Sequence, residues 1–165
     1  MMHFKVCLIG ASAVGKTSLV RRFVDGIFSE KYLTTIGVKI DKKVVAIEEG
    51  EAQLMVWDIE GTDQFSGFTP RFLNGAAAYV VVIDQSRVSS FEDALDVYAK
   101  ARQSSNAQSY LVINKQDLPN QLTDEQLAQT TSLGFSEVVR TSAKDGQNVE
   151  QLFESITRNL LKERS

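Results

Sequence analysis

The chain has 165 residues, 43% of them hydrophobic and 24% charged, and this length suits a single domain that buries about two thirds of its unfolded surface. Its formal net charge of −3 argues against nonspecific nucleic-acid binding as the main task. One histidine, His3, and one cysteine, Cys7, exclude a histidine-based triad or metal site and a disulfide within the chain.

An apolar run over residues 4–9 predicts the first strand, and a helical pattern from Gly15 to about Asp25 predicts the first helix. Cys7 lies inside this strand, where we expect a small buried hydrophobic residue. Between the two elements the sequence reads Gly10-Ala11-Ser12-Ala13-Val14-Gly15-Lys16-Thr17, the P-loop pattern G-x-x-x-x-G-K-[ST]. Because a strand precedes it and a helix follows, we interpret it as a phosphate-binding loop rather than a glycine-rich turn.

Each part of this loop has a chemical reason. Small residues and two glycines let successive N–H groups point at phosphate oxygens, and the helix that follows adds the positive end of its dipole. Lys16 is expected to reach the terminal phosphates, and the Thr17 hydroxyl to ligate a bridging Mg²⁺. The predicted phosphate-binding residues are Gly10, Ser12, Ala13, Val14, Gly15, Lys16, Thr17 and Ser18.

The next apolar runs, 38–47 and 53–58, are separated by Glu48-Glu49-Gly50-Glu51, which predicts a hairpin and one antiparallel strand pair. Continuous apolar runs over 79–84 and 110–114, and a weaker one over 137–141, predict parallel strands that are covered on both faces.

Helical patterns alternate with these strands. The first has an apolar face of Val88, Phe91, Leu95, Tyr98 and Ala99, and the last one of Val149, Leu152, Phe153, Ile156, Leu160 and Leu161. Between them, Leu122, Leu127 and Leu133 predict a shorter helix that Gly134 ends. The alternation predicts an α/β domain with a doubly wound sheet, in which ligands bind at the carboxyl ends of the strands.

Two polar motifs follow the ends of late strands: Asn114-Lys115-Gln116-Asp117 and Ser142-Ala143-Lys144. Together with the P-loop they resemble the guanine-recognition elements of small GTPases. An aspartate accepts hydrogen bonds from guanine N1–H and from the exocyclic amine, whereas adenine offers the wrong donor pattern. The resemblance therefore implies that Asp117 selects GTP over ATP.

The resemblance also implies roles for the neighbours of Asp117. Asn114 ties this loop to the P-loop or binds the N7 edge of the base, and the stem of Lys115 covers one face of the ring. The Ala143 N–H meets guanine O6, with Ser142 and Lys144 beside it.

The whole chain is similar to Ras-like small GTPases, with Rab-type features. This implies one G domain over residues 1–165: a three-layer P-loop NTPase fold with helices on both faces of a six-stranded, mostly parallel sheet that has one antiparallel strand. Phe28 stands where the family stacks an aromatic edge on guanine, and Tyr32-Leu33-Thr34-Thr35-Ile36-Gly37 resembles the first switch. Thr35 is implied to ligate Mg²⁺ and to meet the γ-phosphate through its N–H, and Tyr32 to contact the nucleotide.

The segment Trp57-Asp58-Ile59-Glu60-Gly61 resembles the opening of the second switch. There Asp58 is implied to hold Mg²⁺ through water, and the Gly61 N–H to contact the γ-phosphate. The cofactors implied are thus GTP or GDP with Mg²⁺, and the implied magnesium ligands are Thr17, Thr35 and Asp58.

The second switch departs from the family at two positions. Thr62 replaces the hydrolytic glutamine, which orients the attacking water, so we expect slow intrinsic hydrolysis, with Gln64 as a candidate substitute. Glu60 replaces a small residue, and three interpretations stay open: it points into solvent, it impairs closure of the switch, or it positions water. The implied catalytic residues are Lys16, Thr35, Gly61 and Thr62; an activating protein could add an arginine, with Arg71 as an internal alternative.

Aromatic side chains are candidates for a partner surface across the switches. Trp57, Phe65, Phe68 and Phe72 could supply it, or could pack beneath the second switch, which we favour for Phe72. Ile40 stands where Rab proteins usually have a phenylalanine. The partners implied are effector, exchange-factor and activating proteins.

The sequence after the last predicted helix has no cysteine, so no lipid anchor is encoded here, and we expect a cytoplasmic protein or a truncated chain. Our leading hypothesis is a small protein that cycles between GTP and GDP, hydrolyses GTP slowly and regulates partners through two switch loops. The alternative is a guanine-nucleotide-binding interaction module deficient in hydrolysis. A third interpretation, an ATP-using kinase or ATPase, leaves Asp117 unexplained.

Overall fold

A computed structural model describes residues 1–26, 38–59 and 70–164 of the protein. Its elements, in chain order, are β1 (Met2–Ile9), α1 (Lys16–Asp25), β2 (Val38–Ile47), β3 (Gly50–Ile59), the short 3-10 helix η1 (Pro70–Leu73), β4 (Ala78–Asp84), α2 (Val88–Ser104), β5 (Gln108–Asn114), α3 (Asp124–Thr130), β6 (Glu137–Arg140) and α4 (Val149–Arg164). Several predicted site residues lie outside the described part of the chain: Phe28, Tyr32, Thr35, Glu60, Gly61, Thr62, Gln64, Phe65 and Phe68.

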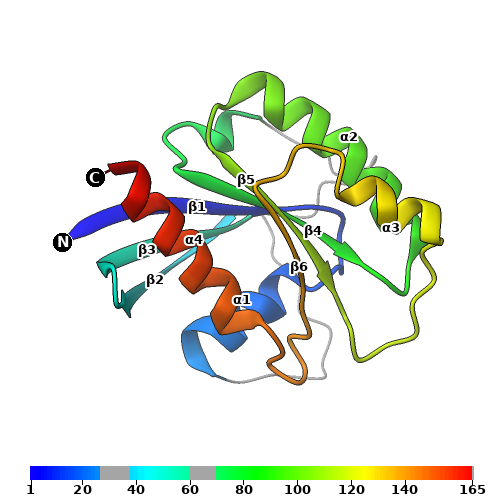
Figure 1. The fold of residues 1–165 in the computed structure, drawn as a ribbon, viewed down its shortest axis with the longest axis horizontal. Coiled ribbons are helices and arrows are strands. Elements are labelled where there is room, and N and C mark those ends of the chain that lie inside the picture. The colour runs from blue at the N-terminus through cyan, green and yellow to red at the C-terminus, as the bar shows by residue number, and fades with distance from the viewer. Residues whose placement is uncertain (27–37, 60–69, 165) are drawn as a thin grey trace.

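The six strands form one sheet in the order β2-β3-β1-β4-β5-β6 (Figure 1). Neighbouring strands run parallel except for the β2–β3 hairpin, which is antiparallel. Every residue of β4 is buried, as expected for a parallel strand that is covered on both faces. The predicted α/β fold with one antiparallel strand is therefore confirmed.

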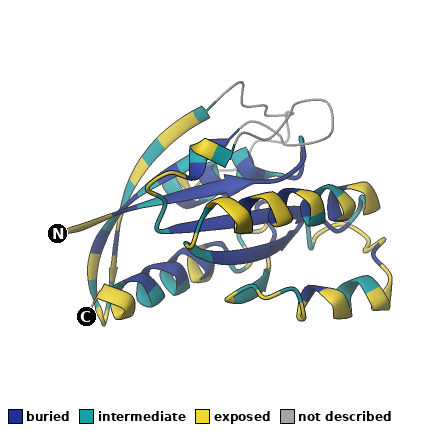
Figure 2. Cartoon of the chain, turned by 90° about the horizontal axis from the view of Figure 1, so that it is seen from above, coloured by how far each residue is buried: buried dark blue, intermediate teal, exposed yellow. Residues whose placement is uncertain are grey.

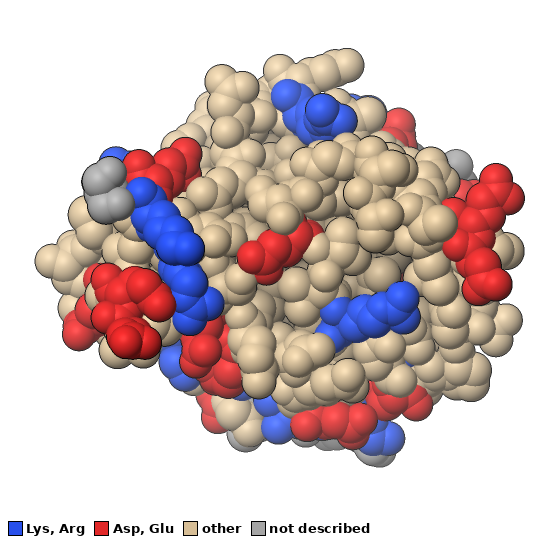
Figure 3. Space-filling model, viewed as in Figure 1, with Lys and Arg blue, Asp and Glu red and all other residues tan. Residues whose placement is uncertain are grey.

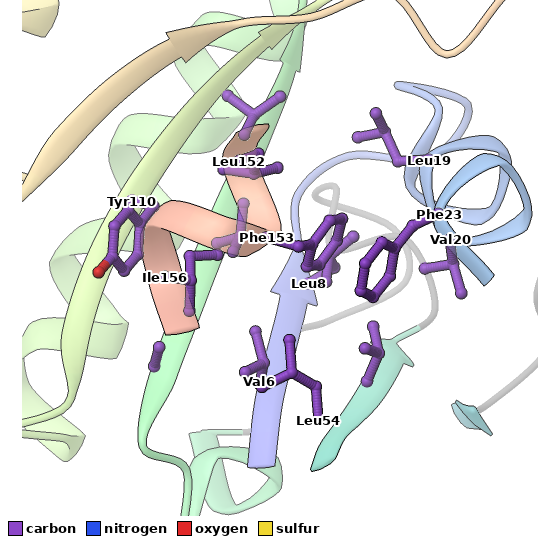
Figure 4. Close-up of a cluster of buried hydrophobic side chains, with 14 of the residues drawn as sticks. Val6, Leu8, Leu19, Val20, Phe23, Leu54, Tyr110, Leu152, Phe153 and Ile156 are labelled. Atoms are coloured by element: carbon purple, nitrogen blue, oxygen red, sulfur yellow. The ribbon is translucent and has the colours of Figure 1, made fainter. Parts of the chain in front are cut away.

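Helices cover both faces of the sheet, and each face has its own apolar core. On one face α1 and α4 pack together over β1, and the rings of Phe23 and Phe153 stack with their centroids 3.9 Å apart (Figure 4). On the other face α2 packs over β4 and β5, where Tyr98 stacks on Phe135 at 3.9 Å. Figure 2 shows buried residues concentrated in the strands, while the helices expose their outer faces.

The β2–β3 hairpin has a turn of two residues, Glu48 and Glu49, because Ile47 already pairs with Gly50. Its tip lies against α4, where Arg158 Nε donates to Glu49 Oε2 at 2.9 Å. At the other end of the hairpin Val38 pairs with Ile59. The third strand thus begins at Gly50, earlier than the apolar run from Gln53 indicated, because pairing with β2 extends it into polar sequence.

The predicted helix around Leu122, Leu127 and Leu133 is shorter than the apolar spacing suggested. It begins after Thr123, which forms a capping box with Gln126, and it ends at Thr130. The hydroxyls of Thr130, Thr131 and Ser132 each donate to the carbonyl oxygen three positions earlier, and such bonds compete with continuation of the helix. All three leucines still pack in the second core.

Charged side chains of both signs are interspersed on the face that carries α4 (Figure 3). Over the described ranges, the longest apolar stretch of any helix falls short of what a bilayer crossing requires.

Candidate nucleotide-binding site

The sequence motifs come together at one edge of the sheet. The P-loop follows β1, Asp58 lies near the end of β3, and the two late motifs follow β5 and β6. Because these strands are parallel, their carboxyl ends share one edge, which is where open α/β sheets bind ligands.

The backbone of the P-loop requires its glycines. Gly10 has φ 143°, and a Cβ there would lie 2.5 Å from the Val82 carbonyl oxygen. Gly15 has φ 104°, and its Cβ would lie 2.2 Å from Asn114 Nδ2. Ala13, with φ 62°, is a left-handed non-glycine residue, and such residues between ordinary ones form the concave N–H nests that bind anions. The loop therefore has the backbone shape of an anion-binding cradle, and it leads into the N-terminus of α1.

Lys16 is buried against this loop, with 5% of its surface exposed. Its Nζ donates to the carbonyl oxygens of Gly10, at 3.0 Å, and Ala11, at 2.8 Å. The ammonium group thus lies beside the start of the cradle, where a P-loop lysine is placed to reach the β- and γ-phosphates.

The Thr17 hydroxyl donates to Asp58 Oδ2 at 2.6 Å, and Asp58 is 1% exposed. These two hard oxygen donors, next to an anion cradle, fit Mg²⁺, which takes one or two protein oxygens and completes its shell with phosphate and water. Within the described ranges no cluster of three or more His, Cys, Asp or Glu residues could hold a metal by itself. The donor set therefore fits an ion shared with a phosphate ligand; Thr35, the third predicted ligand, lies outside the described residues.

Asn114 connects the three motifs. It is 1% exposed, its Nδ2 donates to the Val14 carbonyl oxygen at 3.0 Å, and its Oδ1 accepts from the Thr141 hydroxyl at 2.9 Å. Of the two roles considered for Asn114, the structure contains the bond to the P-loop. The phosphate cradle and the two late motifs are thus joined through one buried amide.

The two late motifs also contact one another where base recognition was predicted. Ser142 Oγ donates to Asp117 Oδ1 at 2.9 Å, which orients an exposed carboxylate. Ala143 is buried, Lys144 is exposed, and Arg22 of α1 donates to the carbonyl oxygens of both, at 2.8 Å to Ala143. Asp117 is therefore held with one oxygen bonded and its edge facing solvent.

Lys115 has a left-handed backbone, with φ 67°. Its Nζ donates to the Ala13 carbonyl oxygen at 3.0 Å and pairs with Asp84 Oδ2 at 2.9 Å. These bonds fix the ammonium end, and contact of its stem with a base stays a prediction.

Sequence reasoning missed the residues that follow β4. Asp84 holds Lys115 and also accepts from the backbone and hydroxyl of Ser86, at 2.8 and 2.6 Å. Arg87 Nη2 donates to the Ser12 carbonyl oxygen at 2.6 Å. Their position in the sequence could have identified them, because they are polar residues directly after a buried strand, like the residues of the other motifs.

The partner-surface residues are only partly described. Trp57 pairs with Ile40 across the hairpin, packs partly buried against the second core, and has Lys5 Nζ 3.8 Å from its ring centroid. Ile40 is 48% exposed, whereas Phe72 packs partly buried against the second core, as favoured for it.

Comparisons with known proteins agree with this arrangement. The family model described as the Ras family matches residues 5–162. The Ras-related protein Rab-13 of Mesocricetus auratus is 34% identical over 165 residues, an alignment that covers 96% of this chain and 80% of the relative.

Proposed function

This chain belongs to the Ras family and is a small GTP-binding protein of Ras and Rab type, and we propose that it is a switch with slow intrinsic GTP hydrolysis. Members of this family are GTPases that bind GTP or GDP with Mg²⁺. One observation supports nucleotide binding most directly: the Asn114 side chain bonds to Val14 of the P-loop and to Thr141, which directly precedes the last motif, so the proposed phosphate-binding and base-binding segments are connected through one buried amide.

In the proposed mechanism the P-loop N–H groups and Lys16 bind the phosphates, while Asp117 recognises guanine from a position that Ser142 fixes. Thr17 and Asp58, with Thr35, would hold Mg²⁺, which neutralises phosphate charge when it is bound. Thr35 and Gly61 would contact the γ-phosphate, so its loss would release both loops and change the surface offered to partners.

The slow rate rests on Thr62. Catalysis of phosphoryl transfer consists largely of positioning and electrostatic stabilisation, and a threonine hydroxyl reaches less far than the glutamine amide of the family. Glu60 adds a carboxylate beside the same glycine. Both departures also support the alternative, a module that holds the nucleotide and barely hydrolyses it.

A single-turnover assay separates the two functions. The protein is loaded with GTP and Mg²⁺, and phosphate release is followed for wild type and Thr62→Gln, with Thr131→Gln at the exposed end of α3 as a control. Slow release that only Thr62→Gln accelerates supports the switch. Tight GTP binding without release from either protein supports the binding module, and no binding of GTP contradicts both.

We further propose a cytoplasmic location and recognition of effector, exchange-factor and activating proteins through the two switch segments. Ile40 is exposed in β2, shortly after the first switch segment, and Trp57 is half-buried in β3, shortly before the second; both side chains support such a surface.

A further inference from the structure

The carbonyl oxygens of the P-loop accept hydrogen bonds from side chains, one after another. Lys16 binds those of Gly10 and Ala11, Lys115 binds that of Ala13, and Asn114 binds that of Val14. Arg87 binds the remaining one of this run, that of Ser12. Lys16, Lys115 and Asn114 belong to the motifs of the site, whereas Arg87 belongs to none of them.

The geometry points to Arg87 as a positioning residue that aims the Ala13 N–H at the phosphates of the bound nucleotide. The Ser12 carbonyl and the Ala13 N–H belong to one peptide unit, and the structure has no cis peptide bond over its described ranges. In a planar trans peptide the C=O and N–H point in opposite directions. By fixing the direction of the Ser12 carbonyl, Arg87 therefore also fixes the direction of the Ala13 N–H on the opposite side of the same peptide.

Charge gives the contact a second effect. A hydrogen bond from a guanidinium is charge-assisted and stronger than one between neutral groups. Drawing electron density toward the carbonyl oxygen makes the amide at the other end of the same peptide a better donor, as in any chain of hydrogen bonds. The Ala13 N–H is thus both oriented and strengthened as a ligand for an anion.

The backbone of Ala13 explains why the loop needs this support. A left-handed conformation is sterically unfavourable for a non-glycine residue, and Ala13 adopts one with φ 62°. Its two flanking peptides are each held by a cation, through the Ser12 carbonyl by Arg87 and through the Ala13 carbonyl by Lys115. The two cations come from neighbouring strand ends, after β4 and β5.

Arg87 is itself held in place. Its backbone N–H donates to the Asp84 carbonyl oxygen at 3.0 Å, and its own carbonyl oxygen accepts from Ser90 in the first turn of α2. Asp84 also holds Lys115, so one short segment organises both cations that support Ala13. Arg71, the internal arginine considered from the sequence, is exposed on η1.

This inference rests on the proposed nucleotide binding, and its test separates the two. Arg87→Met removes the donors and keeps much of the length, while Arg87→Lys keeps the charge. Arg102→Met is the matched control, because Arg102 lies in the last turn of α2, the helix that Arg87 precedes, and also donates to a carbonyl oxygen, that of Leu133, at 3.2 Å. Amide ¹H shifts and GDP release are measured on the GDP–Mg²⁺ complex of each protein.

We expect Arg87→Met to shift the Ala13 amide proton upfield, more than those of Val14 and Gly15, and to release GDP about tenfold faster, the loss of roughly one charge-assisted hydrogen bond. Arg87→Lys should recover part of both effects, and Arg102→Met should show neither. The inference is wrong if the Ala13 shift or the GDP release rate is unchanged, or if amides shift throughout the protein together with a lower Tm. If Arg87→Met does not fold, the Ala13 amide shift and the GDP release rate of Arg87→Lys are compared with those of wild type, and the same criteria apply. Wild type that binds no GDP contradicts the proposed function instead.

Discussion

Asn114 and Val14, one hundred residues apart in the chain, are joined by a 3.0 Å hydrogen bond from the side-chain amide to the backbone carbonyl oxygen. The bond brings the Asn114 amide so close to Gly15 that any Cβ there would lie 2.2 Å from its nitrogen. The Thr141 hydroxyl also holds the Asn114 amide, so the amide cannot move away from such a Cβ without breaking a hydrogen bond.

Gly15→Ala should therefore abolish GDP binding and destabilise the protein by about 3 kcal/mol, through the clash and the left-handed backbone together. Gly26→Ala is the matched control: Gly26 has φ 70°, but its Cβ would meet no atom of the described residues within 4 Å. Gly26→Ala should lower the free energy of unfolding by only about 1 kcal/mol, the cost of the left-handed backbone alone, and should leave GDP binding unchanged. Urea unfolding and GDP titration of both variants measure the difference, and equal losses would contradict it.

Thr17→Ala should weaken Mg²⁺ binding to the nucleotide complex about tenfold, since it removes the hydroxyl that we propose as an Mg²⁺ ligand and that lies 2.6 Å from Asp58 Oδ2. Thr17→Ser keeps the hydroxyl and should stay close to wild type. The measurement is GDP release against free Mg²⁺ concentration. If the Mg²⁺ midpoints of Thr17→Ala and Thr17→Ser coincide, the Thr17 hydroxyl is not a ligand.

Asp117→Asn should lower GTP affinity about a hundredfold or more, because an amide cannot accept both guanine hydrogen bonds and presents a donor to one of them. Affinity for ATP should change little, so the ratio of the two affinities should collapse. Asp124→Asn, a similar change in the exposed first turn of α3, should leave the ratio intact. An unchanged ratio in Asp117→Asn would place guanine recognition elsewhere.

Stability should fall at alkaline pH. Burial raises the pKa of Cys7 to about 12 from an ordinary value of 9.0, so above pH 9 the unfolded chain loses this proton while the folded protein keeps it. The unfolded state then binds fewer protons, and the free energy of unfolding drops by up to about 1.4 kcal/mol per pH unit between pH 9 and 12.

Burial acts in the same direction on Tyr79 and Tyr110, whose pKa values are raised from 10.0 to about 12. Urea unfolding of wild type and Cys7→Ala between pH 8 and 11 tests the effect. Cys7→Ala should be less stable than wild type at pH 8 but should lose less stability as the pH rises. If the free energies of unfolding of the two proteins fall in parallel with pH, Cys7 does not cause the alkaline loss of stability.

The sequence predicted those parts of the site that local chemistry determines. The P-loop was recognisable because its glycines, Lys16 and Thr17 are contiguous and each has a local reason. Asn114 and Asp117 were recognised because their motif resembles a guanine-recognition element of small GTPases and directly follows a buried run. The end of α3 was misjudged because apolar spacing says nothing of hydroxyls that bond back to the helix.

Arg87 shows what a single sequence does not reveal. It lies 75 residues from Ser12 and fits no motif, and its role depends on which strand ends lie side by side. The strand order β1-β4-β5 places the segment after β4 between the P-loop and the Asn114 loop. An arginine at this position can therefore reach a P-loop carbonyl, although no local pattern marks it.

The pairing of Val38 with Ile59 has a consequence for regulation. The first proposed switch ends at Gly37, directly before Val38, and the second continues directly after Ile59, so both proposed switches adjoin the same pair of opposed strand residues. The opposite end of this hairpin is attached to α4 through Glu49 and Arg158. The two segments therefore share one anchor, and a protein or a substitution that displaces it acts on both segments together.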